Sequence, residues 1–128
     1  MEDTTRAFFD NFVEAFRSFS GAVVAQRYLA PYLAFHTPTS IQAFTSHAEI
    51  ARYFQGILDG YHTQGCRSCR YKNLVTHALG EGCVVATVTW ELLAEDASVI
   101  SAWRESYNLC LMGGELKVFA STDHPSAP

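Results

Sequence analysis

Apolar residues recur at helical spacing near the start of the chain and predict a first helix. Its apolar face would consist of Phe8, Phe9, Phe12, Val13 and Phe16. Thr4 or Thr5 could cap this helix, and the Ser20-Gly21 pair would end it. A short second helix is predicted over residues 22–29, because Pro31 cannot continue a helix.

The third predicted helix has the clearest start in the chain. Ser46 and Glu49 have the spacing of a capping box, in which the serine hydroxyl accepts the Glu49 amide N–H and the Glu49 carboxylate reaches back to the Ser46 amide. Five apolar residues then share one face: Ile50, Phe54, Ile57, Leu58 and Tyr61. Gly56 and Gly60 each weaken a helix by about 1 kcal/mol relative to alanine. Close packing is therefore expected at these two glycines.

The second half of the chain alternates apolar and polar residues, which is typical of strands. Residues 70–122 contain four such runs joined by short turns, and one turn, Gly113-Gly114, has the two-residue length of a hairpin. Two shorter strands are predicted over residues 32–37 and 41–45. Helices followed by a meander predict an α+β fold, in which a curved, mostly antiparallel sheet lies over three N-terminal helices.

Two hairpins can be phased independently. A two-residue turn at Gly113-Gly114 places Tyr107 opposite Ala120, and apolar alternation in the preceding hairpin places Trp90 opposite Trp103. Both hairpins then agree on an inner face that carries Trp90, Trp103 and Tyr107, which we expect to be the wall of a pocket. The outer face would carry polar residues: Thr87, Thr89, Glu91, Arg104, Ser106 and Asn108.

The same register places Glu105 on the apolar face, between Trp103 and Tyr107 in sequence. Burial would raise the pKa of this carboxyl, as a general acid or base near neutral pH requires. A bulge, a rim position or an arginine partner would instead give Glu105 a structural role. Phe54, on the third helix, would cover the pocket as a lid.

The facing of residues 70–79 stays open, because two turns could follow them. A two-residue turn at Glu81-Gly82 would point four residues inward: Tyr71, Asn73, Val75 and His77. A three-residue turn over residues 80–82 with a bulge would instead point another four inward: Lys72, Leu74, Thr76 and Ala78. His77 is therefore a conditional site residue.

The composition is that of a globular protein with an excess of aromatic residues. Of its 128 residues, 48% are hydrophobic and 13% are aromatic, and the aromatic excess indicates a lined cavity. The net charge of −4 argues against a nucleic-acid partner, since phosphate binding needs concentrated Lys and Arg. No apolar run approaches the ~20 residues of a membrane span. The N-terminus does not resemble a signal peptide. We therefore expect a cytoplasmic protein of one domain, residues 1–128, with residues 1–4 and 125–128 frayed.

In the cytoplasm the four cysteines, Cys66, Cys69, Cys83 and Cys110, would be reduced thiols. Cys66 and Cys69 have the spacing of a metal-binding or redox pair, but residues three apart in a strand point to opposite faces. A tight turn over residues 65–68 could bring the two sulfurs together. Cys83 and Cys110 would share the outer face. No cofactor and no metal are predicted for the pocket.

The order of these elements resembles the NTF2-like superfamily of cone-shaped α+β folds, which includes SnoaL-like and ketosteroid-isomerase-like proteins. The resemblance covers residues 5–124. It rests on the Phe-rich first helix, the Tyr28-Leu-Ala-Pro31 segment before a strand that ends at Pro38, the capped third helix, and the closing meander with Arg104-Glu-Ser-Tyr107. The superfamily includes isomerases, dehydratases, epoxide hydrolases, polyketide cyclases and non-enzymatic association modules. Because members commonly dimerise through the sheet, the resemblance implies a homodimer.

The residues that the resemblance would make catalytic are largely missing. Isomerase relatives have a catalytic Asp directly before the Pro that follows the first strand, and Thr37 takes this place here. They also use a Tyr on the first helix, where this chain has only phenylalanines on the apolar face. Strand alternation groups Thr37 with Leu33 and Phe35. It leaves His36 on the other face with Tyr32, at a rim or an interface, unless a twist or bulge brings His36 into the pocket as the base.

Three functional hypotheses follow, and the sequence does not decide whether the protein is an enzyme. The first is a pocket for a small apolar or aromatic molecule, used for binding or for an isomerase, dehydratase or hydrolase step. Its ligand-binding residues would be Trp90, Trp103, Tyr107 and Phe54, and its catalytic residues Glu105 and His36. The second is a dimeric association module with a filled core, and the third is a thiol or zinc site at Cys66 and Cys69. A cavity of ~300 Å³ or more would favour the first.

Overall fold

The computed structural model describes residues 1–36 and 40–124. Its helices are α1 (Glu2–Arg17), α2 (Gly21–Ala25) and α3 (His47–Thr63). Its strands are β1 (Tyr28–His36), β2 (Ser40–Phe44), β3 (Ser68–Ala78), β4 (Cys83–Leu93), β5 (Val99–Met112) and β6 (Glu115–Asp123). The strands form one sheet in the order β2-β1-β6-β5-β4-β3, in which β1 and β6 are parallel and the other neighbours antiparallel. The described residues therefore have the predicted α+β architecture.

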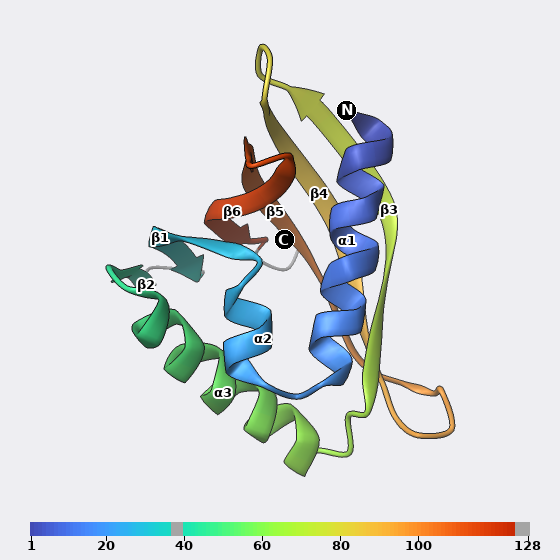
Figure 1. Ribbon diagram of the computed structural model, residues 1–128. Coiled ribbons are helices and arrows are strands. Elements are labelled where there is room, and N and C mark those ends of the chain that lie inside the picture. The colour runs from blue at the N-terminus through green and yellow to red at the C-terminus, as the bar shows by residue number, and fades with distance from the viewer. Residues whose placement is uncertain (37–39, 125–128) are drawn as a thin grey trace.

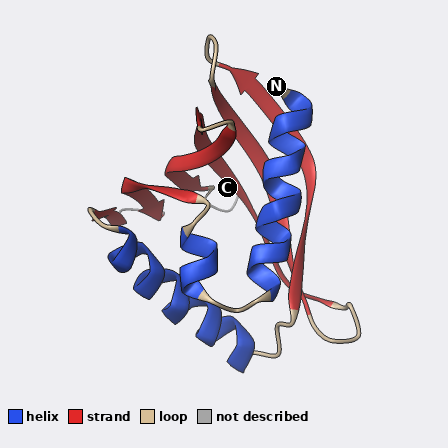
Figure 2. Cartoon of the chain, in the orientation of Figure 1, coloured by secondary structure: helices blue, strands red, loops and turns tan. Residues whose placement is uncertain are grey.

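The sheet curves around the helices (Figures 1 and 2). Figure 1 shows α1 running along β3, while α2 and α3 pack together below the sheet. The phenylalanines of α1 are buried against the sheet, and Phe9 is fully enclosed. This arrangement leaves the concave face of the sheet opposite the apolar faces of the helices. None of the described helices combines the length and the apolar character needed to cross a bilayer.

The start of α1 and the end of α2 differ from the predictions. Met1, rather than Thr4 or Thr5, is the N-cap of α1, so residues 2–4 form its first turn. Thr5 is buried, and its hydroxyl donates to the Met1 carbonyl. The helix predicted over residues 22–29 ends at Ala25, and β1 begins at Tyr28. Pairing of β1 with β6 outweighs the local helical pattern. The expected frayed end at 125–128 lies outside the described residues.

The predicted cap of α3 is confirmed, but its close contact is elsewhere. The Ser46 hydroxyl accepts the Glu49 amide N–H at 3.2 Å, while the Glu49 carboxylate accepts from the Thr45 and Ser46 hydroxyls instead of the Ser46 amide. A Cβ added to either predicted glycine of close packing, Gly56 or Gly60, would meet no atom within 4 Å. A Cβ on Gly21 would lie 2.1 Å from the Ala51 carbonyl oxygen. The close approach therefore joins α2 to α3 at Gly21.

The predicted register of β4 and β5 is confirmed, with Trp90 opposite Trp103. The turn at Gly113-Gly114 also has the predicted register near its tip, but a bulge at Phe119 shifts the rest of β6 by one residue. Tyr107 consequently lies opposite Ser121 and not opposite Ala120. A one-residue shift exchanges the two faces of a strand, so the residues after the bulge face the other way from the prediction.

Both alternatives for β3 hold in part, because this strand has its own bulge between residues 72 and 75. Before the bulge, Tyr71 lies opposite the inward-facing Trp90, and after it Thr76 lies opposite the inward-facing Ala86. The following turn has three residues, 80–82, since Ala78 pairs with Val84 and the Leu79 amide donates to the Cys83 carbonyl. His77 falls on the exposed outer face. It is therefore not a residue of the pocket.

Candidate functional site

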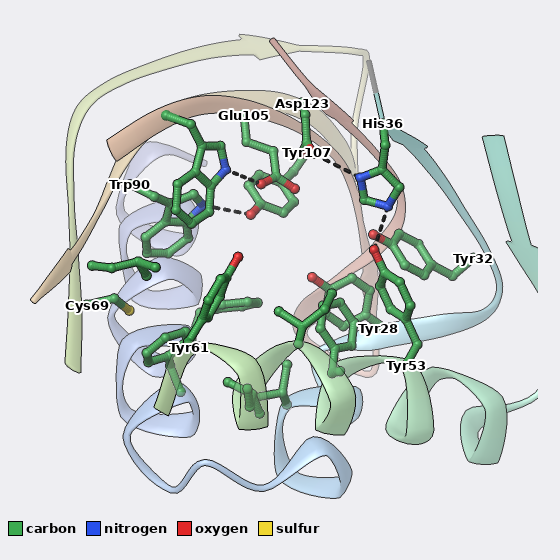
Figure 3. A pocket seen from close by; sticks show the side chains of 18 residues that line it. Tyr28, Tyr32, His36, Tyr53, Tyr61, Cys69, Trp90, Glu105, Tyr107 and Asp123 are labelled. Carbon is green, nitrogen blue, oxygen red and sulfur yellow. Dashed lines mark hydrogen bonds and ion pairs between the residues drawn. The ribbon is translucent and has the colours of Figure 1, made fainter. Parts of the chain in front are cut away.

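A cavity of about 110 Å³ lies between the concave face of the sheet and the helices (Figure 3). Ten of its 18 lining residues are Phe, Tyr or Trp, and three more have acid–base side chains: His36, Glu105 and Asp123. The core is therefore not filled, yet the cavity is smaller than the ~300 Å³ of a drug-sized pocket. It is closer to the ~150 Å³ of an engineered apolar cavity that holds benzene. One substituted ring is the size of ligand that this space suits.

Glu105 lies in the wall of this cavity, on β5. The indole N–H of Trp103 donates to its Oε1 at 2.8 Å. Burial first, and then the nearby Asp123 carboxylate, raise the pKa of Glu105 to about 8. No ion pair joins Glu105 to a cation among the described residues. Both protonation states of this carboxyl are therefore populated slightly above neutral pH. The group also borders the space where a ligand would lie.

Asp123 comes to the cavity through the bulge at Phe119. Without the bulge, the register of the hairpin would place Thr122 opposite Glu105 and turn Asp123 to the outer face. With the bulge, Asp123 is the residue opposite Glu105, and two carboxyl groups share one wall. The Asp123 carboxylate opposes a second negative charge in this wall, and so it favours the protonated form of Glu105.

His36 also lines the cavity, which corrects the expected facing of β1. Tyr32 and Ala34 are buried, whereas Leu33 is 46% exposed, so the inner face is the one that carries His36. No twist is needed to bring it there. Alternation correctly grouped His36 with Tyr32, but the inner face was assigned to the group that contains Leu33 and Phe35. Thr37 lies outside the described residues.

The imidazole of His36 is held from both sides (Figure 3). Its Nδ1 lies 2.9 Å from Oδ2 of Asp123, and its Nε2 is hydrogen-bonded to the hydroxyl of Tyr53 on α3. Burial raises the pKa of Tyr53, so this phenol keeps its proton at neutral pH. In the neutral imidazole, Nε2 can accept a hydrogen bond from the Tyr53 hydroxyl while Nδ1–H donates one to Asp123. The ring orientation is therefore fixed at the edge of the cavity.

The aromatic walls are fixed by hydrogen bonds within the lining. The indole N–H of Trp90 donates to the Tyr107 hydroxyl at 2.7 Å, and the Tyr32 hydroxyl shares a hydrogen bond of 2.6 Å with Ser121. Phe54 packs beside Tyr28, with ring centroids 4.7 Å apart. The structure thus brings all six predicted site residues to one cavity: Glu105, His36, Trp90, Trp103, Tyr107 and Phe54.

Sequence reasoning missed several residues of the lining. Asp123 was hidden by the bulge, which alternation does not reveal. Tyr53 projects from α3 four residues before Ile57, a helical-face spacing that could have placed it with Ile57 and Tyr61, which were already on the predicted apolar face but were not named as lining residues. Tyr28 was missed because it was assigned to the second helix.

The cysteines do not form a metal site in the part of the chain that the structure describes. No group of three or more His, Cys, Asp and Glu side chains there converges on one point. Cys66 and Cys69 are both buried and free, and the Cys66 thiol donates to the Ser68 carbonyl. Burial raises the pKa of both thiols, which disfavours the thiolate that metal binding and nucleophilic attack require.

Solved structures with this fold cover almost the whole chain. Aln2 from a Streptomyces species has a TM-score of 0.77 and 9% identity over 96% of this chain and 89% of its own. A cystatin-like-fold protein of unknown function from Nostoc punctiforme has a TM-score of 0.76 and 12% identity over 99% and 93%. A calcium/calmodulin dependent protein kinase II association domain from Xanthomonas campestris has a TM-score of 0.67 and 16% identity over 96% and 87%. These likenesses show the fold alone.

No curated protein matches the sequence. A family model does match, over residues 2–126, and its description is NTF2-like protein (DUF6841). The match spans nearly all of the chain and agrees with the curved sheet and the three helices. The chain therefore belongs to this family of NTF2-like proteins.

Proposed function

We propose that the protein binds a small aromatic or apolar molecule in this cavity and carries out an acid–base step on it, of the isomerase, dehydratase or hydrolase type. One observation carries the proposal: Glu105 and Asp123 lie opposite each other in the wall of an aromatic cavity. A carboxyl that keeps its proton to about pH 8 can donate that proton, and its ionised form can take one back.

The other lining residues have supporting roles in this proposal. Trp90, Trp103, Tyr107 and Phe54 would hold the ring of the ligand by apolar and aromatic contact. His36 is oriented by Asp123, and its Nε2 accepts from the Tyr53 hydroxyl, so it would take a ligand proton through that hydroxyl at the edge of the cavity. The two groups would then act on different atoms of one ligand.

Binding can be measured on the two tryptophans, which are the only ones in the chain and both line the cavity. Titration with single-ring compounds such as phenol and benzyl alcohol is expected to shift both indole N–H signals in a saturable way. Ile57→Phe would fill the cavity and abolish the shifts, whereas Ile41→Phe adds the same group to a side chain that is 60% exposed. Absence of any saturable shift in the folded parent protein would refute the binding proposal.

The acid–base step can be measured with a single-ring probe, 3-cyclohexen-1-one. A base removes a proton from the carbon between the carbonyl and the alkene, and the protonated base returns it to the far alkene carbon, which gives 2-cyclohexen-1-one with its stronger ultraviolet absorbance. We expect catalysis that rises with pH through the pKa of Glu105, about 8, and falls at least ~100-fold in Glu105→Gln. The control Glu81→Gln lies in the exposed β3–β4 turn. Equal rates for the parent and Glu105→Gln would refute the catalytic part of the proposal.

A second candidate is a homodimeric association module, favoured by an apolar groove on the outer face of the sheet. The groove has a volume of about 510 Å³, and its exposed residues include Leu33, Met112 and Phe119. The solved structure from Xanthomonas campestris described as an association domain has the same fold. Sedimentation should show a dimer that Phe119→Asp converts to a monomer. A monomeric parent protein would refute this candidate and leave the pocket proposal standing.

A further inference from the structure

The proposed function leaves open the charge of the ligand. Resting on that function, we propose that the cavity selects a small organic cation, a protonated amine attached to a single ring or to a group of that size. Three features of the lining carry this proposal: the balance of charged groups, the aromatic faces, and the hydrogen-bonding groups.

The first feature is a surplus of negative groups. The cavity contains two carboxyl groups, Glu105 and Asp123, and one imidazole, and none of the described lining residues is Lys or Arg. Buried carboxyl groups are normally paired with a cation, because desolvating an unpaired charge is costly. A cation brought in by a ligand would supply the partner that none of the described residues provides for Glu105.

The second feature is the aromatic lining. The faces of Phe, Tyr and Trp rings carry negative electrostatic potential, and cages of such rings bind ammonium groups. Ten rings surround the cavity, including both tryptophans of the chain. The same potential opposes an anionic ligand. Ring faces and carboxyl groups therefore favour the same sign of charge.

The third feature is a pair of hydroxyl groups turned toward the cavity. The Tyr61 hydroxyl has no hydrogen-bond partner among the described residues, and the Tyr28 hydroxyl, on a side chain only 2% exposed, has Tyr32 as its neighbour and keeps an oxygen that can accept. Figure 3 shows Tyr61 pointing from α3 into the open centre of the cavity, below Glu105. A primary ammonium has three N–H donors. Binding of the cation would favour release of the Glu105 proton to solvent, and two phenol oxygens and one oxygen of the ionised carboxylate would then accept all three.

A charge series of matched probes tests the proposal on the unmodified protein. Benzylamine (protonated), benzyl alcohol (neutral) and benzoate (anionic) share one ring and differ in charge. At pH 7, we expect benzylamine to bind at least ~10-fold more tightly than benzyl alcohol, with benzoate weakest, by calorimetry and by the tryptophan indole signals. Benzyl alcohol or benzoate binding as tightly as benzylamine would overturn the cation proposal but not the pocket. Failure of all three to bind would overturn the pocket itself.

Two variants locate the source of the preference. Glu105→Gln and Asp123→Asn should each weaken benzylamine binding ~10-fold and leave benzyl alcohol binding within ~2-fold of the parent. The control Glu115→Gln changes an exposed carboxylate on the same strand as Asp123 and should change neither affinity. Full retention of the benzylamine preference in both pocket variants would overturn the assignment of the cation to this carboxyl pair.

Discussion

Nδ1 of His36 lies 2.9 Å from Oδ2 of Asp123, although 87 residues separate them along the chain. The contact joins the first strand of the sheet to the last, since β1 and β6 are parallel neighbours. Asp123 also lies opposite Glu105 on β5. The Asp123 carboxylate therefore orients the His36 imidazole and also raises the pKa of the partly buried Glu105.

The first prediction concerns the influence of Asp123 on Glu105. The Asp123 carboxylate is the second cause of the raised pKa of Glu105, after burial. Asp123→Asn removes this charge and should lower the pKa of Glu105 below 8, but not to its ordinary value of 4.5, because burial remains. A carbon-13 titration of the Glu105 carboxyl measures the change. An unchanged or higher pKa in the variant would contradict the prediction, and Glu115→Gln is the matched control.

The second prediction concerns stability and pH. Between pH 4.5 and about 8 the folded protein keeps the Glu105 proton while the unfolded chain has lost it. Unfolding therefore releases a proton, and the free energy of unfolding falls by up to ~1.4 kcal/mol per pH unit across this range. The stabilisation that comes from protonated Glu105 is fully present below pH 4.5 and is lost as the pH rises through 8. Glu105→Gln keeps a neutral side chain and should remove this loss.

Urea unfolding at pH 5 and pH 9 checks the second prediction. The difference in the free energy of unfolding between the parent and Glu105→Gln removes the effect of every other titrating group and leaves that of Glu105. We expect the variant to be the more stable protein at pH 9 by a few kcal/mol, and the two to be within about 1 kcal/mol at pH 5. A variant that is equally destabilised at both pH values would show that the pKa of Glu105 is not raised.

The third prediction concerns the packing of α2 on α3. Gly21→Ala places a Cβ against the Ala51 carbonyl and the Gln55 backbone nitrogen, 2.1 and 2.6 Å away. Backbone atoms cannot rotate aside, so we expect a loss of about 1–3 kcal/mol or more in thermal or urea unfolding. Gly56→Ala meets no atom and should instead stabilise α3 by about 1 kcal/mol. Equal effects at the two glycines would contradict the close approach at Gly21.

The fourth prediction concerns the hydrogen bond between Trp90 and Tyr107. Tyr107→Phe leaves the buried indole N–H of Trp90 without its acceptor, which should cost about 1–3 kcal/mol of stability. The Trp90 indole N–H resonance should also move, which separates the lost bond from a general loss of packing. Tyr71→Phe removes a surface hydroxyl that donates to Asp10 and should change stability by less than about 0.5 kcal/mol.

The sequence predicted those parts of the fold that rest on regular periodicity. The pairing of Trp90 with Trp103 followed from alternation, and the start of α3 followed from the Ser46 cap. The inner position of Glu105 followed from the same alternation. Each of these conclusions uses only neighbours along one element or across one tight turn.

The remaining parts depend on local irregularities and on packing between distant segments. The bulges in β3 and β6 have no marked signature in the sequence. They nevertheless bring Asp123 to the cavity and place Thr76, rather than His77, on the inner face of the sheet. The facing of β1 was wrong because an inner face cannot be assigned until the partner strand is known. The roles proposed for Glu105, His36 and the aromatic residues stay predictions until a ligand is measured.

The bulge at Phe119 also affects how this protein tolerates changes in length. Relative to β5, Phe119 is the extra residue, so its deletion would leave regular pairing and keep Asp123 opposite Glu105. A deletion or insertion between residues 120 and 122 would instead turn Asp123 to the outer face. Related chains should therefore tolerate a deletion at the bulge but not in the few residues that follow it. In those residues, a length change of one residue determines whether the cavity has one carboxyl group or two.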